Sequence, residues 1–111
     1  MTLRRGDVVT VAAKGPYTGK PRPALVIQAS ETLPYRDSVT VCLITAELLD
    51  APLFRVRIDP TAMNGLKHPS DIMADKIMTV PASFVSPKAF GKLAPTDLDR
   101  VDAALRFWLS V

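Results

Sequence analysis

Arg22 stands between two prolines in the stretch GKPRPALVIQ, immediately before a run of apolar residues. Proline holds its own φ at about −65° and drives the residue before it toward extended conformations, so the backbone of Arg22 has little freedom. Its guanidinium, whose planar N–H donors can bind a phosphate group, is therefore presented from a nearly fixed base. The same pattern also fits a solvated arginine in a loop that leads into an edge strand.

Several familiar kinds of active site are excluded by residues that the sequence lacks. His68 is the only histidine and Cys42 is the only cysteine. One chain therefore cannot supply a two-histidine acid–base pair, an internal disulfide or a multi-cysteine zinc site. No Walker loop or GxGxxG pattern occurs, which argues against nucleotide hydrolysis and dinucleotide binding. We interpret His68 as a loop residue, with a role in a site as the alternative, and Cys42 as part of an apolar strand rather than a nucleophile.

The remaining reactive residue types are Arg, Lys, Thr, Tyr and Asp. They suit attack on a phosphodiester whose nucleophile already belongs to the substrate. The 2′-hydroxyl of RNA can attack its own 3′-phosphate, so the protein needs only to align these groups, stabilise the added negative charge and help to move protons. Such chemistry requires no metal ion, and the sequence has no dense acidic group at ligand spacing. We therefore expect no metal and no other cofactor.

The composition describes a small folded protein whose first part is basic. The 111 residues are 48% hydrophobic, which predicts a single domain over residues 1–111. Five lysines and arginines but one aspartate lie within residues 1–22, and the formal net charge is +3. This imbalance is a weak indication of a polyanionic partner. The first residues lack the apolar core of a signal peptide and no run is long enough to span a membrane, so we expect a cytoplasmic protein.

Alternation of apolar and polar residues predicts an antiparallel β-sheet. The expected strands cover residues 7–13, 23–28, 38–45, 53–59 and 71–80, and a short helical turn and a last short strand follow within residues 81–93. In the fourth strand, the apolar side chains are expected to face inward. Arg55 and Arg57 are expected to face outward, where they are solvated or paired across strands.

The clearest element is a carboxy-terminal helix of about 14 residues. Pro95 and Thr96, followed by Asp99, predict its start with a pair that resembles a capping box. A helix after a run of strands gives the fold class α+β. Its apolar face is expected to consist of Leu98, Val101, Leu105 and Leu109.

Five segments, spread over nearly the whole chain, together resemble one family. They are RGDVVTV, GKPRPALVIQ, VCLITAEL, NGLKHPSDIMADKIMTVP and FGKLAPTDLDRVDAALRFWL. In order and spacing they are similar to the opening strand, the RP-containing run, the strand ending in Thr or Ser, the acidic strand and the terminal helix of the MazF/PemK toxins of type II toxin–antitoxin systems. The resemblance implies an antiparallel SH3-like β-barrel of the CcdB/MazF type with a C-terminal α-helix.

The resemblance also implies an activity and partners. Toxins of this family inhibit growth by cutting single-stranded RNA, including mRNA, at specific sequences. They need no metal and leave a 2′,3′-cyclic phosphate and a 5′-hydroxyl. The resemblance further implies a homodimer and a cognate antitoxin. We expect the antitoxin to have a disordered, acidic segment that folds over the basic loop before Arg22 as it binds.

The family pattern maps three catalytic positions onto this sequence. The arginine of the RP motif corresponds to Arg22, which would stabilise the phosphorane and, in the family's mechanism, exchange protons. The hydroxyl at the end of the third strand corresponds to Thr45, which would donate a hydrogen bond to a nonbridging phosphate oxygen. Asp75 matches an acidic position of the PemK branch, although Met73 replaces the arginine that commonly stands two residues earlier. Asp75 would act as a base, bind the edge of an RNA base, or orient Arg22.

Further residues are candidates for RNA binding. Lys14, Tyr17 and Lys20 lie in the cationic loop before Arg22, and Lys76 follows the acidic position of the fifth strand. Lysines in such places bind phosphates, and a tyrosine can stack on a base. The alternative is that these loop side chains are only solvated.

Two other functions fit parts of the sequence. The same fold family, as the resemblance implies, includes CcdB-like toxins that poison DNA gyrase, and the end RFWLSV is similar to their Trp-bearing tail. On the helix, Trp108 adjoins the apolar face, so packing in the core or at a dimer interface is the competing interpretation. A non-catalytic RNA-binding barrel is the third reading, in which the identities of Arg22 and Thr45 would not matter. An RNA cleavage assay in EDTA and a gyrase supercoiling assay separate these functions.

Overall fold

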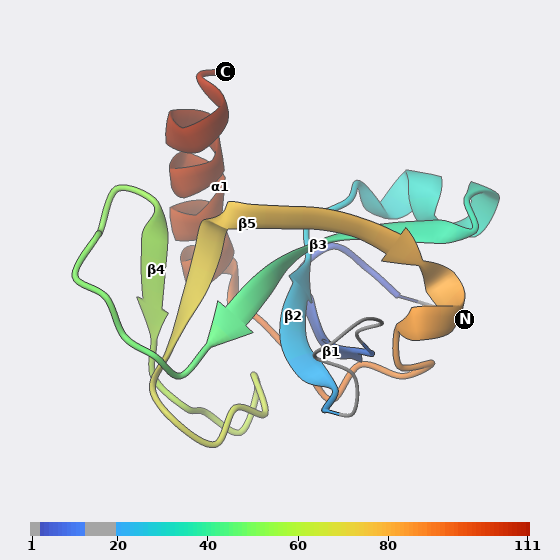
Figure 1. Ribbon diagram of the computed structural model, residues 1–111, viewed down its shortest axis with the longest axis horizontal. Helices are drawn as coiled ribbons and strands as arrows, with labels where there is room; N and C mark the ends of the chain where they lie inside the picture. The colour runs from blue at the N-terminus through green and yellow to red at the C-terminus, as the bar shows by residue number, and fades with distance from the viewer. Residues whose placement is uncertain (1–2, 13–19) are drawn as a thin grey trace.

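A curled antiparallel sheet with one helix against it forms the body of the structure (Figure 1). The computed structural model describes residues 3–12 and 20–111. The strands are β1 (Asp7–Val11), β2 (Arg22–Val26), β3 (Ser38–Thr45), β4 (Arg55–Ile58), β5 (Ser70–Pro81) and β6 (Gly91–Lys92). Within the described ranges, these six strands lie in the order β4-β5-β3-β2-β1-β6, and each neighbouring pair is antiparallel. The predicted α+β class and barrel-like sheet are confirmed.

A sharp bend in β5 gives the sheet its curl. Strand β3 pairs Cys42 with Ile77 and Ile44 with Ile72, so a step of two residues on β3 faces a step of five on β5. Such an irregularity is a bulge, which bends the strand that carries the extra residues. Figure 1 shows β5 turning at this point, with its first part beside β4 and its second part along β3. The bend lets one strand cover two different parts of the core.

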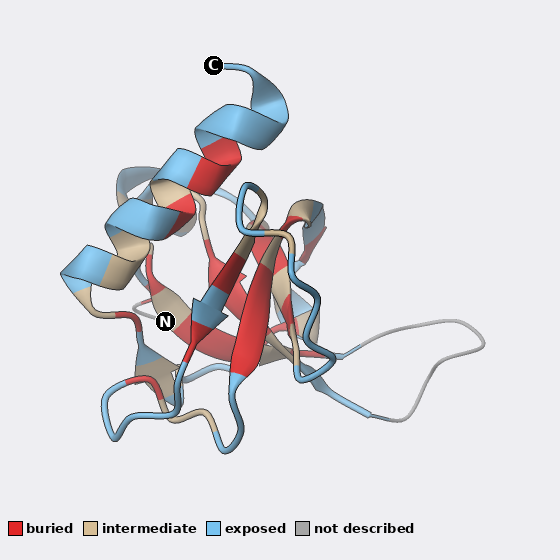
Figure 2. Cartoon of the chain, turned by 90° about the vertical axis from the view of Figure 1, so that its left-hand side faces the viewer, coloured by how far each residue is buried: buried red, intermediate tan, exposed pale blue. Residues whose placement is uncertain are grey.

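The central strands are buried on both faces, which explains their nearly continuous apolar sequences. Successive residues of β1 point to opposite faces: Val8 belongs to a core under helix α1 (Pro95–Leu109), and Val9 belongs to a second core on the other face. Figure 2 shows the buried residues concentrated on the strands and on the side of the helix that faces them. The helix contributes Val101, Ala104 and Leu105 to the first core.

Helix α1 begins without a side-chain cap. The predicted capping box of Thr96 and Asp99 is wrong, because Ala94 is the N-cap residue and no side chain bonds there. Pro95 occupies the first helical position, where its missing N–H needs no partner and its φ already suits a helix. Leu109 was expected on the buried face but is 53% exposed. The last turn of the helix extends beyond the sheet (Figure 1), which agrees with the partial exposure of this residue.

The connections between strands follow the sequence with small differences. Two short 3-10 helices occur, η1 (Ser30–Tyr35) and η2 (Ala82–Phe84), of which the second is the predicted helical turn before the last strand. Strand β3 has its predicted bounds, whereas β4 is shorter than predicted because residues 52–54 form a turn. None of the helices in residues 3–12 and 20–111 is both long and apolar enough to cross a membrane.

Candidate functional site

Arg22 and Thr45 line the same cavity, whose volume is about 690 Å³. The pairing of their strands explains why they meet. Strands β2 and β3 are antiparallel and place Ala24 opposite Leu43. In an antiparallel pair, a step of two residues back on one strand corresponds to a step of two forward on the other. Arg22 therefore comes opposite Thr45, and residues that face each other across strands point to the same face.

Each of these two side chains has a group available to a ligand. The Thr45 hydroxyl oxygen accepts a hydrogen bond from the backbone N–H of Glu47 at 3.1 Å. Because a hydroxyl both accepts and donates, its proton remains free to point at an acceptor in the cavity. Arg22 is exposed and has no ion-pair or hydrogen-bond partner among the described residues. Pro21 and Pro23, which restrict its backbone, line the same cavity.

A buried asparagine fixes the loop that forms the opposite wall. The side-chain oxygen of Asn64 accepts hydrogen bonds from the backbone N–H groups of Thr61 and Leu66, each at 3.0 Å. Its side-chain nitrogen donates to the carbonyl of Asp59 at 2.9 Å. Asn64 is only 3% exposed, so these bonds replace water almost completely. The loop between β4 and β5 is therefore fixed at Asn64, next to residues 65–68, which line the cavity.

The cavity carries unneutralised positive charge. Its described lining includes Arg22 and Lys67 but no aspartate or glutamate. His68 lies in the loop, as expected, and it also lines the cavity. A concave surface with one sign of charge favours a ligand of the opposite sign. The arrangement thus suits an anion such as a phosphodiester.

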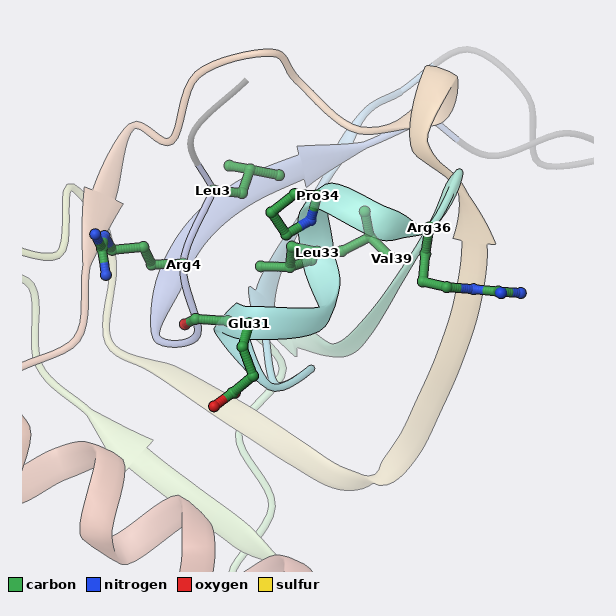
Figure 3. A pocket seen from close by; sticks show the side chains of 8 residues that line it. Leu3, Arg4, Glu31, Leu33, Pro34, Arg36 and Val39 are labelled. Atoms are coloured by element: carbon green, nitrogen blue, oxygen red, sulfur yellow. The ribbon is translucent and has the colours of Figure 1, made fainter.

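A second cavity, of about 490 Å³, lies between the amino-terminal segment and η1 (Figure 3). Its apolar wall is formed by Leu3, Leu33, Pro34 and Val39. Charged side chains of both signs extend away from it, namely Arg4, Glu31 and Arg36. Mixed charges at the rim give no preference for an anion. The cavity that holds Arg22 and Thr45 is therefore the candidate site.

Asp75, the third residue expected in the catalytic site, does not line this cavity. Its Oδ1 atom lies 3.9 Å from Nε of Arg55, and both atoms are buried without a hydrogen-bond partner in the described part of the chain. Thr45 pairs with Asp71, four positions before Asp75 in β5. Asp75 lies within the irregular stretch between Ile72 and Ile77, whereas Thr45 pairs with the regular part of β5 before it. The structure thus brings together two of the three expected catalytic residues.

The residues expected to bind RNA lie in different places. Lys20 is exposed and directly precedes Pro21, so it stands at the entrance of β2. Lys76 is exposed on β5 and is not among the residues that line the cavity. Lys14 and Tyr17 lie outside the described residues.

Sequence reasoning missed a buried carboxylate that joins β5 to β4. The side chain of Asp71 is 1% exposed, and it accepts hydrogen bonds from Nε of Arg57 at 2.6 Å and from the Leu49 N–H at 2.8 Å. Nη1 of Arg55 lies 3.6 Å from Oδ2 of Asp71, the oxygen that accepts from Leu49. Arg57 stands directly opposite Asp71 in the sheet, which confirms the expected pairing across strands for this arginine. The available signal was an aspartate at the start of an otherwise apolar predicted strand.

The charges of this cluster, Arg55–Asp71–Arg57, are mutually stabilised. Burial by itself would raise the pKa of the Asp71 carboxyl. The hydrogen bonds from Arg57 and Leu49 and the charges of the two arginines outweigh burial, so the pKa lies below its ordinary value of 3.8. The hydrogen bond to Asp71 is the main cause of a raised pKa for Arg57. Arg57 and Asp71 are therefore both ionised at neutral pH, and their role is to hold β4, β5 and the segment around Leu49 together.

The only cysteine is not a nucleophile. Cys42 is fully buried in β3, and burial raises the pKa of its thiol to about 12, while the charge of Arg5 opposes this shift and that of Asp75 adds to it. The thiol is thus protonated at neutral pH, as its interpretation as a core residue requires. In the described ranges, no three His, Cys, Asp or Glu side chains gather as a group that could hold a metal ion.

The sequence and the fold were compared with those of known proteins. The model of one family, described as PemK-like, MazF-like toxin of type II toxin–antitoxin system, matches residues 4–109. The chain belongs to the PemK/MazF toxin family. A relative from Mycolicibacterium smegmatis, called probable endoribonuclease MazF, is 48% identical over 109 residues, which cover 98% of each chain.

Solved structures of PemK/MazF toxins share the fold. The Mycobacterium tuberculosis toxin MazF-mt6 superposes with a TM-score of 0.80 at 23% identity and covers 95% of this chain and 97% of its own. The MazE–MazF crystal structure from Deinococcus radiodurans gives a TM-score of 0.81 at 18% identity, over 100% of this chain and 99% of the other. At these identities the likeness concerns the fold, and it confirms the predicted CcdB/MazF-type architecture.

Proposed function

We propose that this toxin is an endoribonuclease that cleaves single-stranded RNA, including mRNA, at specific sequences in the cavity lined by Arg22 and Thr45. The observation that carries the proposal is an arginine and a threonine that line one cavity, whose described lining has cations but no carboxylate. Its close relative from Mycolicibacterium smegmatis, a probable endoribonuclease, supports the activity. Cleavage of mRNA would inhibit growth.

The reaction uses the nucleophile of the RNA itself. The 2′-oxygen forms a bond to the adjacent phosphorus and the bond from phosphorus to the 5′-oxygen breaks. The proton of the 2′-hydroxyl passes to water, and a proton from water reaches the leaving 5′-oxygen. The products are a 2′,3′-cyclic phosphate and a 5′-hydroxyl. Since the substrate supplies the nucleophile, the protein contributes alignment and charge stabilisation, and no metal is needed for either.

Arg22 and Thr45 share the work on the phosphate. The guanidinium of Arg22 donates to the nonbridging oxygens as negative charge builds up on them, which lowers the energy of the phosphorane. The hydroxyl of Thr45, whose oxygen already accepts the Glu47 N–H, donates its proton to one of these oxygens. A guanidinium stays protonated at neutral pH and is a poor base, so charge stabilisation is the role assigned to Arg22.

Other candidate residues act further from the phosphate. Asp75 holds Arg55, which lies 3.9 Å away, and does not touch the scissile group. Lys20 and Lys76, both exposed, bind phosphates along the RNA. In the basic loop, Lys14 also binds phosphate and Tyr17 stacks on a base. These contacts add affinity without selecting a sequence.

The toxin works as a homodimer in the cytoplasm and is neutralised by a cognate antitoxin. Solved structures with this fold include a MazE–MazF complex from Deinococcus radiodurans, which supports a protein antitoxin. Exposed apolar residues at the end of α1 suit burial between subunits. Trp108, whose ring lies 5.3 Å from that of Phe54, is still 47% exposed. An acidic antitoxin segment competes with RNA for the same cationic cavity.

The test is incubation of the purified toxin with single-stranded RNA in EDTA, followed by analysis of the fragment ends. We expect cleavage, with a 2′,3′-cyclic phosphate on one fragment and a 5′-hydroxyl on the other. Activity that is abolished by EDTA and restored by one metal would contradict the mechanism. Intact RNA together with inhibition of gyrase in a supercoiling assay would favour the CcdB-like alternative. Binding of RNA with neither activity would favour a non-catalytic barrel.

A further inference from the structure

An exposed aromatic ring stands in the wall of the cavity and has no part in the reaction described above. Phe90 lines the cavity together with Arg22 and Thr45, and 43% of it is exposed. Sequence reasoning did not single it out, because it precedes the short strand β6 in a stretch without clear periodicity. An exposed ring in the wall of a cavity is available for contact with a ligand that binds there.

The backbone that carries Phe90 is held on two sides. Its N–H donates to the carbonyl of Val8 in β1 at 2.9 Å. Two residues later, the N–H of Lys92 donates to the carbonyl of Met63 at 2.9 Å. These bonds tie the segment to the sheet and to the loop between β4 and β5. The backbone at Phe90 is therefore fixed relative to both the sheet and this loop.

Two glycines allow the segment to approach this loop closely. Gly65 has a φ of +70°, and a Cβ atom there would lie 2.5 Å from the carbonyl oxygen of Phe90 and 2.8 Å from its ring atom Cδ1. A Cβ atom on Gly91 would collide with the backbone of Asn64. Ring atom Cδ1 of Phe90 thus lies where a side chain at position 65 would be, close to a loop that the Asn64 network holds in place. This is a preorganised aromatic surface rather than a loose side chain.

We propose that Phe90 is a platform on which a base of the RNA stacks while the neighbouring phosphate lies at Arg22 and Thr45. The inference rests on the proposed function. Arg22, Thr45 and Lys67 provide contacts to phosphate, and Phe90 adds a contact to the base. Every base has a π-face, so an aromatic ring beside cationic groups is the usual surface for single-stranded nucleic acid. A ring that is already fixed loses little conformational entropy on binding. Phe90 therefore contributes affinity for the nucleotide next to the cut.

The first test makes position 90 fluorescent. Trp108 is the only tryptophan, so Trp108→Phe combined with Phe90→Trp gives a protein with one tryptophan, at the proposed platform. The probe is a mixed-sequence octanucleotide of 2′-O-methyl RNA, which lacks the nucleophile and is not cleaved. We expect its binding to quench the indole emission at position 90 at least twofold, because stacking on a base quenches tryptophan. The wild-type protein, whose tryptophan is on α1, is the control and keeps its emission.

The second test measures cleavage by Phe90→Leu and Phe90→Tyr. We expect Phe90→Leu to raise KM about tenfold with little change in kcat, and Phe90→Tyr to resemble the wild type, because only the second keeps a stacking surface. The control is Tyr35→Leu, which removes an aromatic residue that is 84% exposed on η1. A shared melting temperature of the variants shows that they fold.

Two results overturn the platform and are distinguishable. If the octanucleotide binds, as anisotropy of a labelled copy reports, but emission at position 90 is unchanged and Phe90→Leu has the wild-type KM, the platform is wrong while the proposed ribonuclease stands. If the wild type neither binds the octanucleotide nor cleaves RNA, the proposed function fails and the platform fails with it. A Phe90→Leu variant that loses only affinity for the antitoxin would also overturn the inference and assign the ring to a protein partner.

Discussion

Two neighbouring regions of the sheet both contain arginines, and they use the charge differently. In the cavity, Arg22 stands opposite Thr45 and has no carboxylate partner among the described residues. In the Arg55–Asp71–Arg57 cluster, the buried Asp71 takes a hydrogen bond from Arg57 at 2.6 Å and lies 3.6 Å from Arg55. Thr45 pairs with Asp71 in the sheet, so the regions adjoin. A paired arginine stabilises the fold, whereas an unpaired one is available to a phosphate.

The comparison predicts that Arg22 matters for rate and little for stability. Arg22→Lys keeps the charge but loses the planar set of N–H donors, so we expect kcat/KM for RNA cleavage to fall by about 10²- to 10³-fold. Its melting temperature should equal that of the wild type, since Arg22 is exposed. The matched control is Arg36→Lys, an exposed arginine beside the second cavity. Cleavage by Arg22→Lys at the control's rate would remove Arg22 from the mechanism.

The cluster should show the opposite behaviour. Asp71→Asn removes the buried charge that two arginines face, and we expect it to lower the free energy of unfolding by about 2 kcal/mol. This figure is below the cost for a fully buried ion pair because the Arg57 side chain is 46% exposed and water screens the pair. Urea unfolding measures the effect. At a temperature where the variant is folded, its rate of RNA cleavage should stay within about threefold of the wild-type rate. Loss of a residue that touches the phosphate would have a much larger effect. Unchanged stability would mean that the cluster is not structural.

A smaller effect distinguishes the hydroxyl of Thr45 from its shape. Thr45→Val keeps the branched side chain but removes the donor, and we expect about a tenfold loss in kcat/KM, the value of one hydrogen bond. Thr45→Ser keeps the hydroxyl and should remain within about threefold of the wild type, because it loses only the methyl group that restricts χ1. Single-turnover cleavage compares the two variants. Equal rates for valine and serine would show that the hydroxyl donates nothing to the phosphate.

The pH dependence of stability should report the cluster rather than the cavity. The folded-state pKa of Asp71 lies below its ordinary value of 3.8, so its ionised form is favoured by folding. Its contribution to stability is fully present above the unfolded-state pKa and is lost as pH falls through the lower folded-state pKa. Urea unfolding between about pH 2 and pH 7 should therefore show the wild type and Asp71→Asn converging below about pH 4. A constant difference across this range would contradict the assignment.

Much of the fold could be predicted because it follows from local patterns. The bounds of β3 follow from a run of β-branched and apolar residues, and α1 follows from its spacing of apolar residues. The bend of β5 could not be predicted, since the bulge between Cys42 and Ile44 depends on how two apolar strands align in space. Helix α1 has Pro95 at its first position and no capping box. The sequence fits both a proline start and a capping box, so the local pattern does not decide between them.

The residues of the candidate site could also be predicted only in part. Arg22 directly precedes the predicted strand 23–28 and Thr45 ends the predicted strand 38–45, and the family resemblance assigned both to one site. Asp75 does not line their cavity, because its distance from Thr45 depends on the irregular pairing of β5. Phe90 was missed because its exposure and position depend on close packing against Gly65, a contact between residues 25 positions apart. Long-range packing of this kind has no periodic signal in the sequence.

The most direct test of the shared phosphate site is a double-mutant cycle. Arg22→Lys, Thr45→Val and the double variant are compared with the wild type by kcat/KM for one RNA substrate. If both residues bind the same phosphate, removing either spoils the alignment on which the other depends, so the double variant should be little slower than Arg22→Lys alone. Multiplication of the two single losses in the double variant would show that Arg22 and Thr45 act independently, and would contradict the site proposed for this toxin.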